Sequence, residues 1–165
     1  MANGVFKSGD SVVYPGHGVG TVGDTKTETV GNQAIDFLMV RFETGMTVRI
    51  PTGNIKKCGL RRVSTRQVMR DVFGVLSKGA PATRKKAMWR HRALEYAAKM
   101  KTGDAVAIAE IVRDLHRAPG EGESSFSEKA IYQQAWDHLI PEIAAVQETD
   151  KESAAKKVVS LLEAA

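Results

Sequence analysis

The sequence predicts an α+β protein: a small, strongly bent antiparallel β-sheet or barrel, followed by a compact all-α domain of about five helices. Residues 10–58 are rich in Val, Ile, Thr and Phe and are punctuated by Gly, Asn and Pro, which is typical of short strands joined by tight turns. From Thr65 onward, apolar residues recur at helical spacing instead. We therefore expect a β domain over residues 1–60, a junction near 59–65 and a helical domain over 65–165.

Four stretches of the first part are expected to be strands: DSVVYP, VGTVGDTKTETV, IDFLMVRF and MTVRIP. Residues 18–23, GVGTVG, match the G-x-G-x-x-G pattern of dinucleotide folds, which requires a helix to begin at the last glycine. The Thr-rich DTKTETV follows instead, so these glycines are expected to permit tight bends in the sheet. Cys58 is interpreted as an ordinary small residue at a strand end.

The helical part begins with TRQVMRDVFGVLSK, which places Val68, Val72 and Val75–Leu76 on one face. TRKKAMWRHRALEYAAKMK follows, with Thr83 as its expected N-cap and Gly103 as its C-terminal signal.

The last three helices are expected to begin at polar capping residues. Asp104 precedes AVAIAEIVRDLHRA, and Ser125 with Glu128 has capping-box spacing. The pair Thr149 and Glu152 repeats that spacing before SAAKKVVSLLEA. Pro141 is expected to kink or divide the helix formed by KAIYQQAWDHLIPEIAAV.

The distribution of charge suggests an anionic partner. Residues 61–101 hold twelve Lys/Arg and two Asp/Glu, whereas residues 1–60 hold six and five, and residues 102–165 hold six and twelve. Such a central basic block is found both in nucleic-acid-binding proteins and on ordinary solvated helix surfaces, and charge alone weighs the two equally. The single cysteine excludes a disulfide within the chain and fits a reducing cytoplasm. We find no segment typical of a signal peptide or membrane span.

Catalytic and metal-binding patterns are not visible in the sequence. The four histidines are scattered without a second His or Cys at ligand spacing, so no metal site is predicted. No nucleophile elbow, paired-acid motif or P-loop is present. Cys58 stands in the basic segment IKKCGL, but no partner residue for thiol chemistry accompanies it. We therefore predict a protein that is not an enzyme and carries no cofactor.

Trp89 lies inside the basic segment RKKAMWRHR, residues 84–92. On a helical wheel at about 100° per residue, it shares an apolar stripe with Ala93, Tyr96 and Met100, which favours inward packing. The cations Lys85, Lys86 and Arg92 flank the same stripe, and a second stripe of Ala87, Leu94 and Ala98 lies opposite, where it could pack on the bundle instead. Trp89 would then protrude as an aromatic wedge for DNA. The wheel leaves both interpretations open, with the exposed one slightly favoured.

Four segments in order along the chain resemble the CarD/CdnL family of bacterial transcription regulators: FKSGDSVVYPGHGVG (6–20), TVRIP (47–51), residues 84–92, and TGDAVAIAEIVRDLHR (102–117). The resemblance implies a Tudor-like N-terminal domain that binds the RNA polymerase β subunit, and a helical domain that contacts promoter DNA at the upstream edge of the −10 region. There the family's tryptophan wedges into the minor groove and hinders collapse of the bubble. The resemblance also implies a cytoplasmic protein that joins the nucleoid through polymerase; we expect a monomer with no membrane partner.

The resemblance extends to individual positions. Trp89 matches the family's wedge, and Arg49 in TVRIP matches its polymerase-contacting arginine. A second basic contact of some members falls at Glu28 by spacing. Because Glu28 is acidic, that role is not carried over to it, and nearby Lys26 is the candidate substitute. The further DNA-contact candidates are chosen by chemistry: Lys85, Lys86, Arg90 and Arg92.

Two other classes of protein share features with this sequence. A nucleic-acid-binding module acting without polymerase is the alternative function, but the near-neutral charge of residues 1–60 argues against nucleic-acid recognition by the β domain. A transcription-repair coupling ATPase shares the same type of polymerase-binding domain, but this chain has no P-loop.

Overall fold

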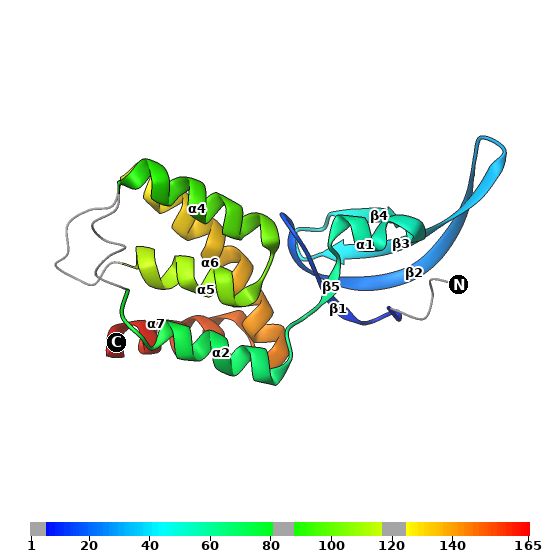
Figure 1. Ribbon diagram of the computed structural model, residues 1–165. Helices are drawn as coiled ribbons and strands as arrows, with labels where there is room; N and C mark the ends of the chain where they lie inside the picture. The colour runs from blue at the N-terminus through cyan, green and yellow to red at the C-terminus, as the bar shows by residue number, and fades with distance from the viewer. Residues whose placement is uncertain (1–5, 81–87, 117–124) are drawn as a thin grey trace. The chain divides into compact units, whose positions relative to one another are not determined.

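A computed structural model describes residues 6–80, 88–116 and 125–165, and its internal contacts divide the chain into two compact units, Met1–Val63 and Ser64–Ala165 (Figure 1). The first unit is an antiparallel sheet and the second is a bundle of helices. The α+β class predicted from the sequence is therefore confirmed.

The sheet has five strands in the order β4-β3-β2-β1-β5. Their bounds are β1 Ser11–Tyr14, β2 Gly18–Val30, β3 Gln33–Phe42, β4 Thr47–Pro51 and β5 Arg61–Arg62. A 3-10 turn, Thr52–Asn54, and the one-turn helix α1, Ile55–Cys58, connect β4 to β5. The four predicted strands are confirmed. The fifth was missed because two residues are too short to carry a periodic signal.

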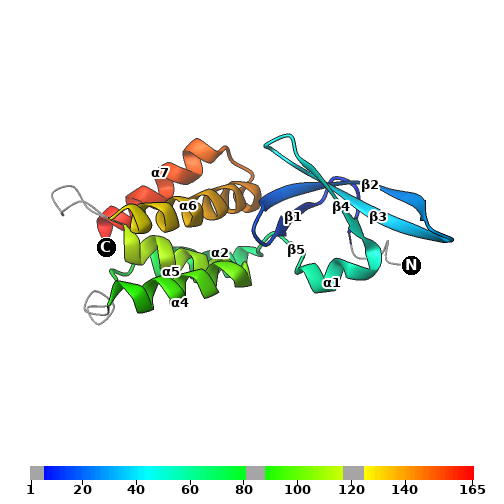
Figure 2. The same cartoon turned by 90° about the horizontal axis from the view of Figure 1, so that it is seen from above.

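One face of the sheet is buried and the other is exposed. Leu38, Val40 and Ile50 alternate with exposed or half-buried neighbours and pack with the residues Phe6, Val12, Val22, Phe42, Ile55 and Leu60. Beyond the bulge between Val22 and Thr25, β2 and β3 pair mainly with each other near their turn, so they extend as a two-stranded ribbon (Figure 2).

The glycines of residues 18–23 are part of the sheet. All of them lie in β2, which continues to Val30 with no helix after the last glycine. A Cβ on Gly20 would lie 2.8 Å from Cγ1 of Val40 and 3.0 Å from the ring of Phe42. Only glycine therefore lets β2 approach the core so closely.

Cys58 does not end a strand, contrary to the prediction. It ends α1, where its thiol donates a hydrogen bond to the carbonyl of Ile55 at 3.1 Å and packs against the core of the sheet. The four residues IKKC form only one helical turn before Gly59, which is too short to carry a helical pattern in the sequence.

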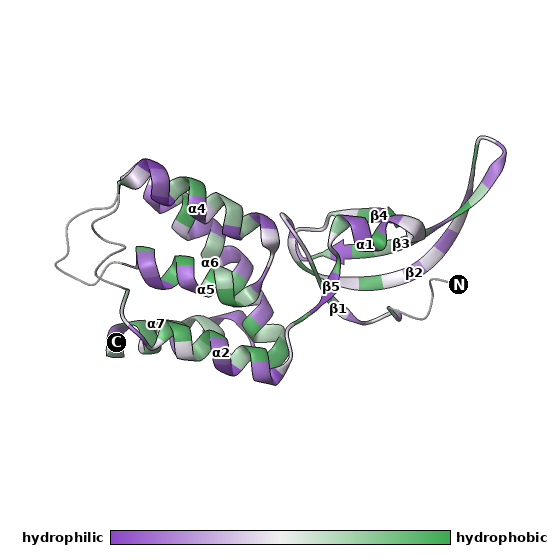
Figure 3. Ribbon diagram, in the orientation of Figure 1, coloured by the Kyte–Doolittle hydropathy of each residue, from purple (hydrophilic) through white to green (hydrophobic). Residues whose placement is uncertain are grey.

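The second unit contains α2 Arg66–Leu76, α4 Trp89–Thr102, α5 Ala105–Leu115, α6 Phe126–Gln147 and α7 Lys151–Ala164. Helix α5 packs against α2, α4 and α6, and α7 packs against α6 and α2 (Figures 1 and 2). Hydrophilic and hydrophobic residues both occur along α4 (Figure 3), and its buried residues Tyr96 and Met100, four positions apart, lie on one side of the helix. Among the described helices, none is both long enough and apolar enough to cross a bilayer.

Two of the predicted caps are confirmed and a third is wrong by one residue. The side chains of Asp104 and Ser125 accept backbone hydrogen bonds at the starts of α5 and α6. Helix α7 is capped by Asp150, which accepts from the Ser153 amide at 2.9 Å, and not by Thr149. Both residues are good N-caps, so only the backbone path decides between them.

Pro141 does not divide α6, which runs unbroken from Phe126 to Gln147. Proline removes one backbone donor, and the loss is tolerated because the residues around it are firmly packed: Leu139, Ile140 and Ile143 are buried in the core of the bundle.

The helix that contains Trp89 begins later than predicted. Met88, with φ −61° and ψ 137°, is extended, and α4 starts at Trp89. The proposed cap Thr83 lies outside the described residues. The C-terminal signal is confirmed, because Gly103 adopts φ 67° after the last turn.

Candidate functional site

Arg49 lies on the exposed face of the sheet, as the alternation in TVRIP predicted. It is on β4 beside Met39 of β3, and its side chain is 54% exposed while Ile50 points into the core. Its guanidinium lies 5.7 Å from the ring centroid of Phe37. A cation held over an aromatic ring on an open sheet face is a suitable contact for a protein partner.

Glu28, the position that departs from the family pattern, is the ionic partner of Arg49. Nη1 of Arg49 donates to both carboxylate oxygens of Glu28, each at 2.8 Å. Lys26, two residues earlier on the same face of β2, is exposed and lines a hollow of about 570 Å³ with Met39 and Arg41. Its suggested role as a substitute basic contact stays a prediction.

Trp89 is neither fully exposed nor a core residue. It is the first residue of α4, it is partly exposed, and it packs against the apolar core of the helical unit. Its ring centroid lies 6.2 Å from that of Tyr96, which is one fully buried ring of that core. The indole is therefore braced from the inside while part of its surface stays open.

Arg92 packs beside both aromatic rings. Its guanidinium carbon lies 5.6 Å from the centroid of Trp89 and 5.7 Å from that of Tyr96. Its Nη2 also donates to the Tyr96 hydroxyl at 3.3 Å. By contrast, Arg90 is exposed on the same helix. The two arginines that the sequence grouped together thus have different surroundings.

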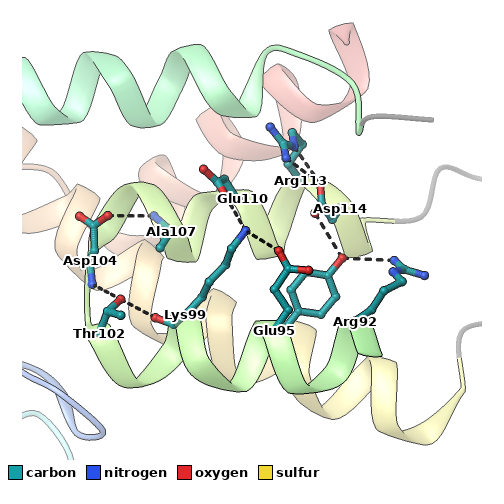
Figure 4. Close-up of polar contacts among 10 residues, drawn as sticks. Arg92, Glu95, Lys99, Thr102, Asp104, Ala107, Glu110, Arg113 and Asp114 are labelled. Carbon is teal, nitrogen blue, oxygen red and sulfur yellow. Dashed lines mark hydrogen bonds and ion pairs between the residues drawn. The ribbon is translucent and has the colours of Figure 1, made fainter. Parts of the chain in front are cut away.

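A polar relay anchors Arg92 to α5 (Figure 4). The Tyr96 hydroxyl donates to Asp114 at 3.2 Å, and the buried Asp114 carboxylate accepts from Nε of Arg113 at 2.9 Å. An ion pair further along the same two helices joins Lys99 to Glu110. These contacts tie α4 to α5, so the position of Trp89 depends on both helices.

Burial raises the pKa of Tyr96 above its ordinary value of 10.0, with the Asp114 carboxylate acting in the same direction and Arg92 opposing it. The phenol therefore stays protonated across the physiological range. Only in that form does it donate a hydrogen bond to Asp114 while accepting one from Arg92.

Two expectations from the helical wheel are wrong. The second stripe does not pack on the bundle, because Leu94 is 68% exposed and the inward side of α4 carries Tyr96 and Met100. The placement of Lys85 and Lys86 beside the stripe of Trp89 assumed one helix through Met88, which is extended. Those two lysines lie outside the described residues.

Several residues that shape these sites gave no clear signal in the sequence. Phe37 sits in IDFLMVRF, where both phases of the strand are apolar, so alternation could not place it outside. Asp114 lies in an amphipathic helical segment in which nothing distinguishes it from other charged residues, and its partner Tyr96 is 18 positions away.

Comparison with known proteins covers both units. Residues 6–64 match the model of the CarD-like/TRCF RID domain, and residues 71–159 match the model described as CarD, C-terminal domain. Over 144 residues the chain is 28% identical to the Bacillus subtilis (strain 168) protein named "Putative transcription factor YdeB", spanning 87% of this chain and 93% of that protein.

A solved structure is similar to the first unit in sequence. The solution NMR structure of the 72-residue N-terminal domain of Myxococcus xanthus CarD is 34% identical and covers 35% of this chain and 79% of that domain, with a TM-score of 0.31. The fold assignment rests on the strand order and helices described above. The two CarD models match successive parts of the sequence, and the second alone spans more than half of it. The chain belongs to the CarD/CdnL family of transcription regulators that interact with RNA polymerase.

Proposed function

We propose that this chain binds the RNA polymerase β subunit through the exposed sheet face around Arg49 and stabilises the open promoter complex with Trp89. The observation that carries the proposal is the bracing of a partly exposed indole at the start of α4 by Arg92 and Tyr96. A wedge must be large, apolar and fixed in direction, and Trp89 has these properties.

The wedge would act at the upstream edge of the −10 region. Separating stacked base pairs costs a few kcal/mol per step, so an aromatic side chain that occupies the gap opposes reclosure of the duplex. The exposed Arg90 would contact phosphates beside it, and we extend this role to Lys85 and Lys86 from their place in the sequence. Arg92 would serve mainly to hold the indole.

The contact with the β subunit would place the chain at the promoter, and the Trp89 wedge would stabilise the open complex there. Binding by Arg49 places the regulator at the promoter, where phosphate contacts by themselves carry no sequence information. No chemical reaction is required of the chain, so we propose a regulator that acts by binding alone.

Substitution of Trp89 tests the proposal. Aromatic–base stacking contributes about 1–3 kcal/mol by alanine substitution, so Trp89→Ala should shorten the open-complex lifetime about fivefold or more. The matched control is Leu94→Ala, which removes an exposed apolar side chain from the opposite side of the same helix and should leave the lifetime unchanged.

Melting curves separate the wedge from a purely structural role. Trp→Ala in a full core costs about 3–5 kcal/mol, and partial burial of Trp89 predicts a smaller loss that leaves the variant folded and bound to polymerase. An unchanged lifetime in a folded variant would overturn the wedge. Retention of promoter activity without any polymerase binding would favour the stand-alone module instead.

A further inference from the structure

Glu28 and Arg49 form an ion pair across three strands of the exposed sheet face. Glu28 lies on β2 beside Ile35, Arg49 lies on β4 beside Met39, and Phe37 of β3 lies between them. Both carboxylate oxygens of Glu28 accept hydrogen bonds from Nη1 of Arg49 at 2.8 Å, and the guanidinium lies over the Phe37 ring. The arginine side chain is therefore held on two sides, by a charge and by a ring.

The ion pair leaves most of the guanidinium available. Within the part of the chain that the structure describes, Arg49 uses only Nη1 in hydrogen bonds, so Nε and Nη2 remain as donors. An arginine carries five N–H donors in a planar fork, and the edge formed by Nε and one Nη nitrogen matches the two oxygens of a carboxylate. Arg49 can thus bind Glu28 and a second carboxylate at the same time.

We propose that Glu28 is a positioning residue for polymerase binding: it holds the guanidinium of Arg49 over Phe37 with its free edge directed to a carboxylate of the β subunit. This inference rests on the proposed role of Arg49. It also defines the partner surface, which should offer an acidic group to Arg49 and a neutral or basic group opposite Glu28.

Two effects of Glu28 oppose each other, and their sizes decide the sign. Immobilising a long side chain at an interface weakens binding by roughly twofold to tenfold. Because Glu28 already holds the Arg49 side chain in the free protein, this loss does not arise on binding. Repulsion between Glu28 and the incoming carboxylate acts across the intervening guanidinium, between groups that are half exposed, where salt screens it. Positioning therefore outweighs repulsion at physiological ionic strength.

The test measures binding of the full chain to core RNA polymerase. Glu28→Gln keeps the size of the side chain and removes its charge, and we expect the dissociation constant to rise about threefold. Asp24→Asn removes the same charge from an exposed position of the same strand and should leave affinity unchanged. The loss should appear as faster dissociation, because one acidic charge fewer does not slow the approach to an acidic partner.

A double-mutant cycle distinguishes this inference from the role of Arg49 itself. In an Arg49→Ala background, Glu28→Gln should have no further effect, because there is no guanidinium left to position. If Arg49→Ala weakens binding but Glu28→Gln leaves it unchanged or tightens it, positioning by Glu28 is overturned while the polymerase contact stands. If Arg49→Ala leaves binding unchanged in a folded chain, both fall together.

Discussion

The guanidinium of Arg92 lies over the indole of Trp89, with 5.6 Å between its carbon and the ring centroid. The same group donates to the hydroxyl of Tyr96, whose other partner is the buried Asp114. A basic residue that sequence alone would assign to DNA is thereby part of the support of the aromatic ring. The surroundings of Arg92 and its neighbour Arg90 lead to the first prediction.

Arg90→Gln and Arg92→Gln should weaken DNA binding in different ways. Each phosphate contact adds about 0.9 to the negative slope of log K against log salt on duplex DNA, so Arg90→Gln should lower that slope by roughly this amount. Arg92→Gln should leave the slope nearly unchanged and shorten the open-complex lifetime, because it loosens Trp89. Salt titrations of both variants on one duplex, with promoter dissociation rates, give the comparison; equal slopes for both variants would refute it.

Tyr96→Phe should destabilise the helical unit by about 1–3 kcal/mol, because the buried Asp114 loses one hydrogen-bond donor and Arg92 loses an acceptor. Tyr132→Phe is the matched control: its half-buried hydroxyl lies 3.4 Å from Nδ1 of His116, a longer contact to a side chain that is not an acid. We expect a smaller loss there. Urea unfolding of the two variants measures the difference, and equal losses would argue against the relay.

Gly20→Ala should destabilise the β unit by about 1–3 kcal/mol through overpacking, because its new methyl group would lie 2.8 Å from Val40. Gly53→Ala supplies the comparison, since no atom lies within 4 Å of a Cβ at that position. Thermal unfolding of both variants checks the prediction. If Gly20→Ala and Gly53→Ala were equally stable, the close approach of β2 to the core would not explain why residue 20 is glycine.

The cap of α7 should give a pH-dependent contribution to stability. Hydrogen bonds from Ser153 hold the pKa of Asp150 below its ordinary value of 3.8 in the folded chain. A depressed carboxyl pKa means that the contribution is complete above the unfolded value and is lost as pH falls through the folded value.

The stability difference between the native chain and Asp150→Ala should therefore be constant near neutral pH and narrow below about pH 4. Thr149→Ala, which changes the residue that is not the cap, should show no such narrowing. Unfolding curves from pH 7 to pH 3 test both, and a difference that does not vary with pH would contradict the assignment of the cap.

Local sequence patterns determined the strands, several helix starts and the exposure of Arg49. Alternation of apolar residues predicts the strands that contain Val40 and Ile50. Capping chemistry and helical spacing within a few residues predict the helix starts at Asp104 and Ser125. Exposure of Arg49 follows from the same alternation, because Ile50 beside it must enter the core. Such features need no knowledge of distant parts of the chain.

Packing between segments distant in the sequence decided the rest. A helical wheel gives directions relative to Trp89 but not which stripe meets α5, and contact with α5 and α6 turned Tyr96 inward and left Leu94 exposed. The start of α4 depended on an extended Met88 that no local signal marked.

Polar pairs that join distant positions show the same limit most clearly. Glu28 meets Arg49 across 21 positions, and Tyr96 meets Asp114 across 18. Sequence determined that these residues are charged or polar; only tertiary structure brought each to its partner, because ion pairs and hydrogen bonds act over a few ångströms of space and are indifferent to separation along the chain.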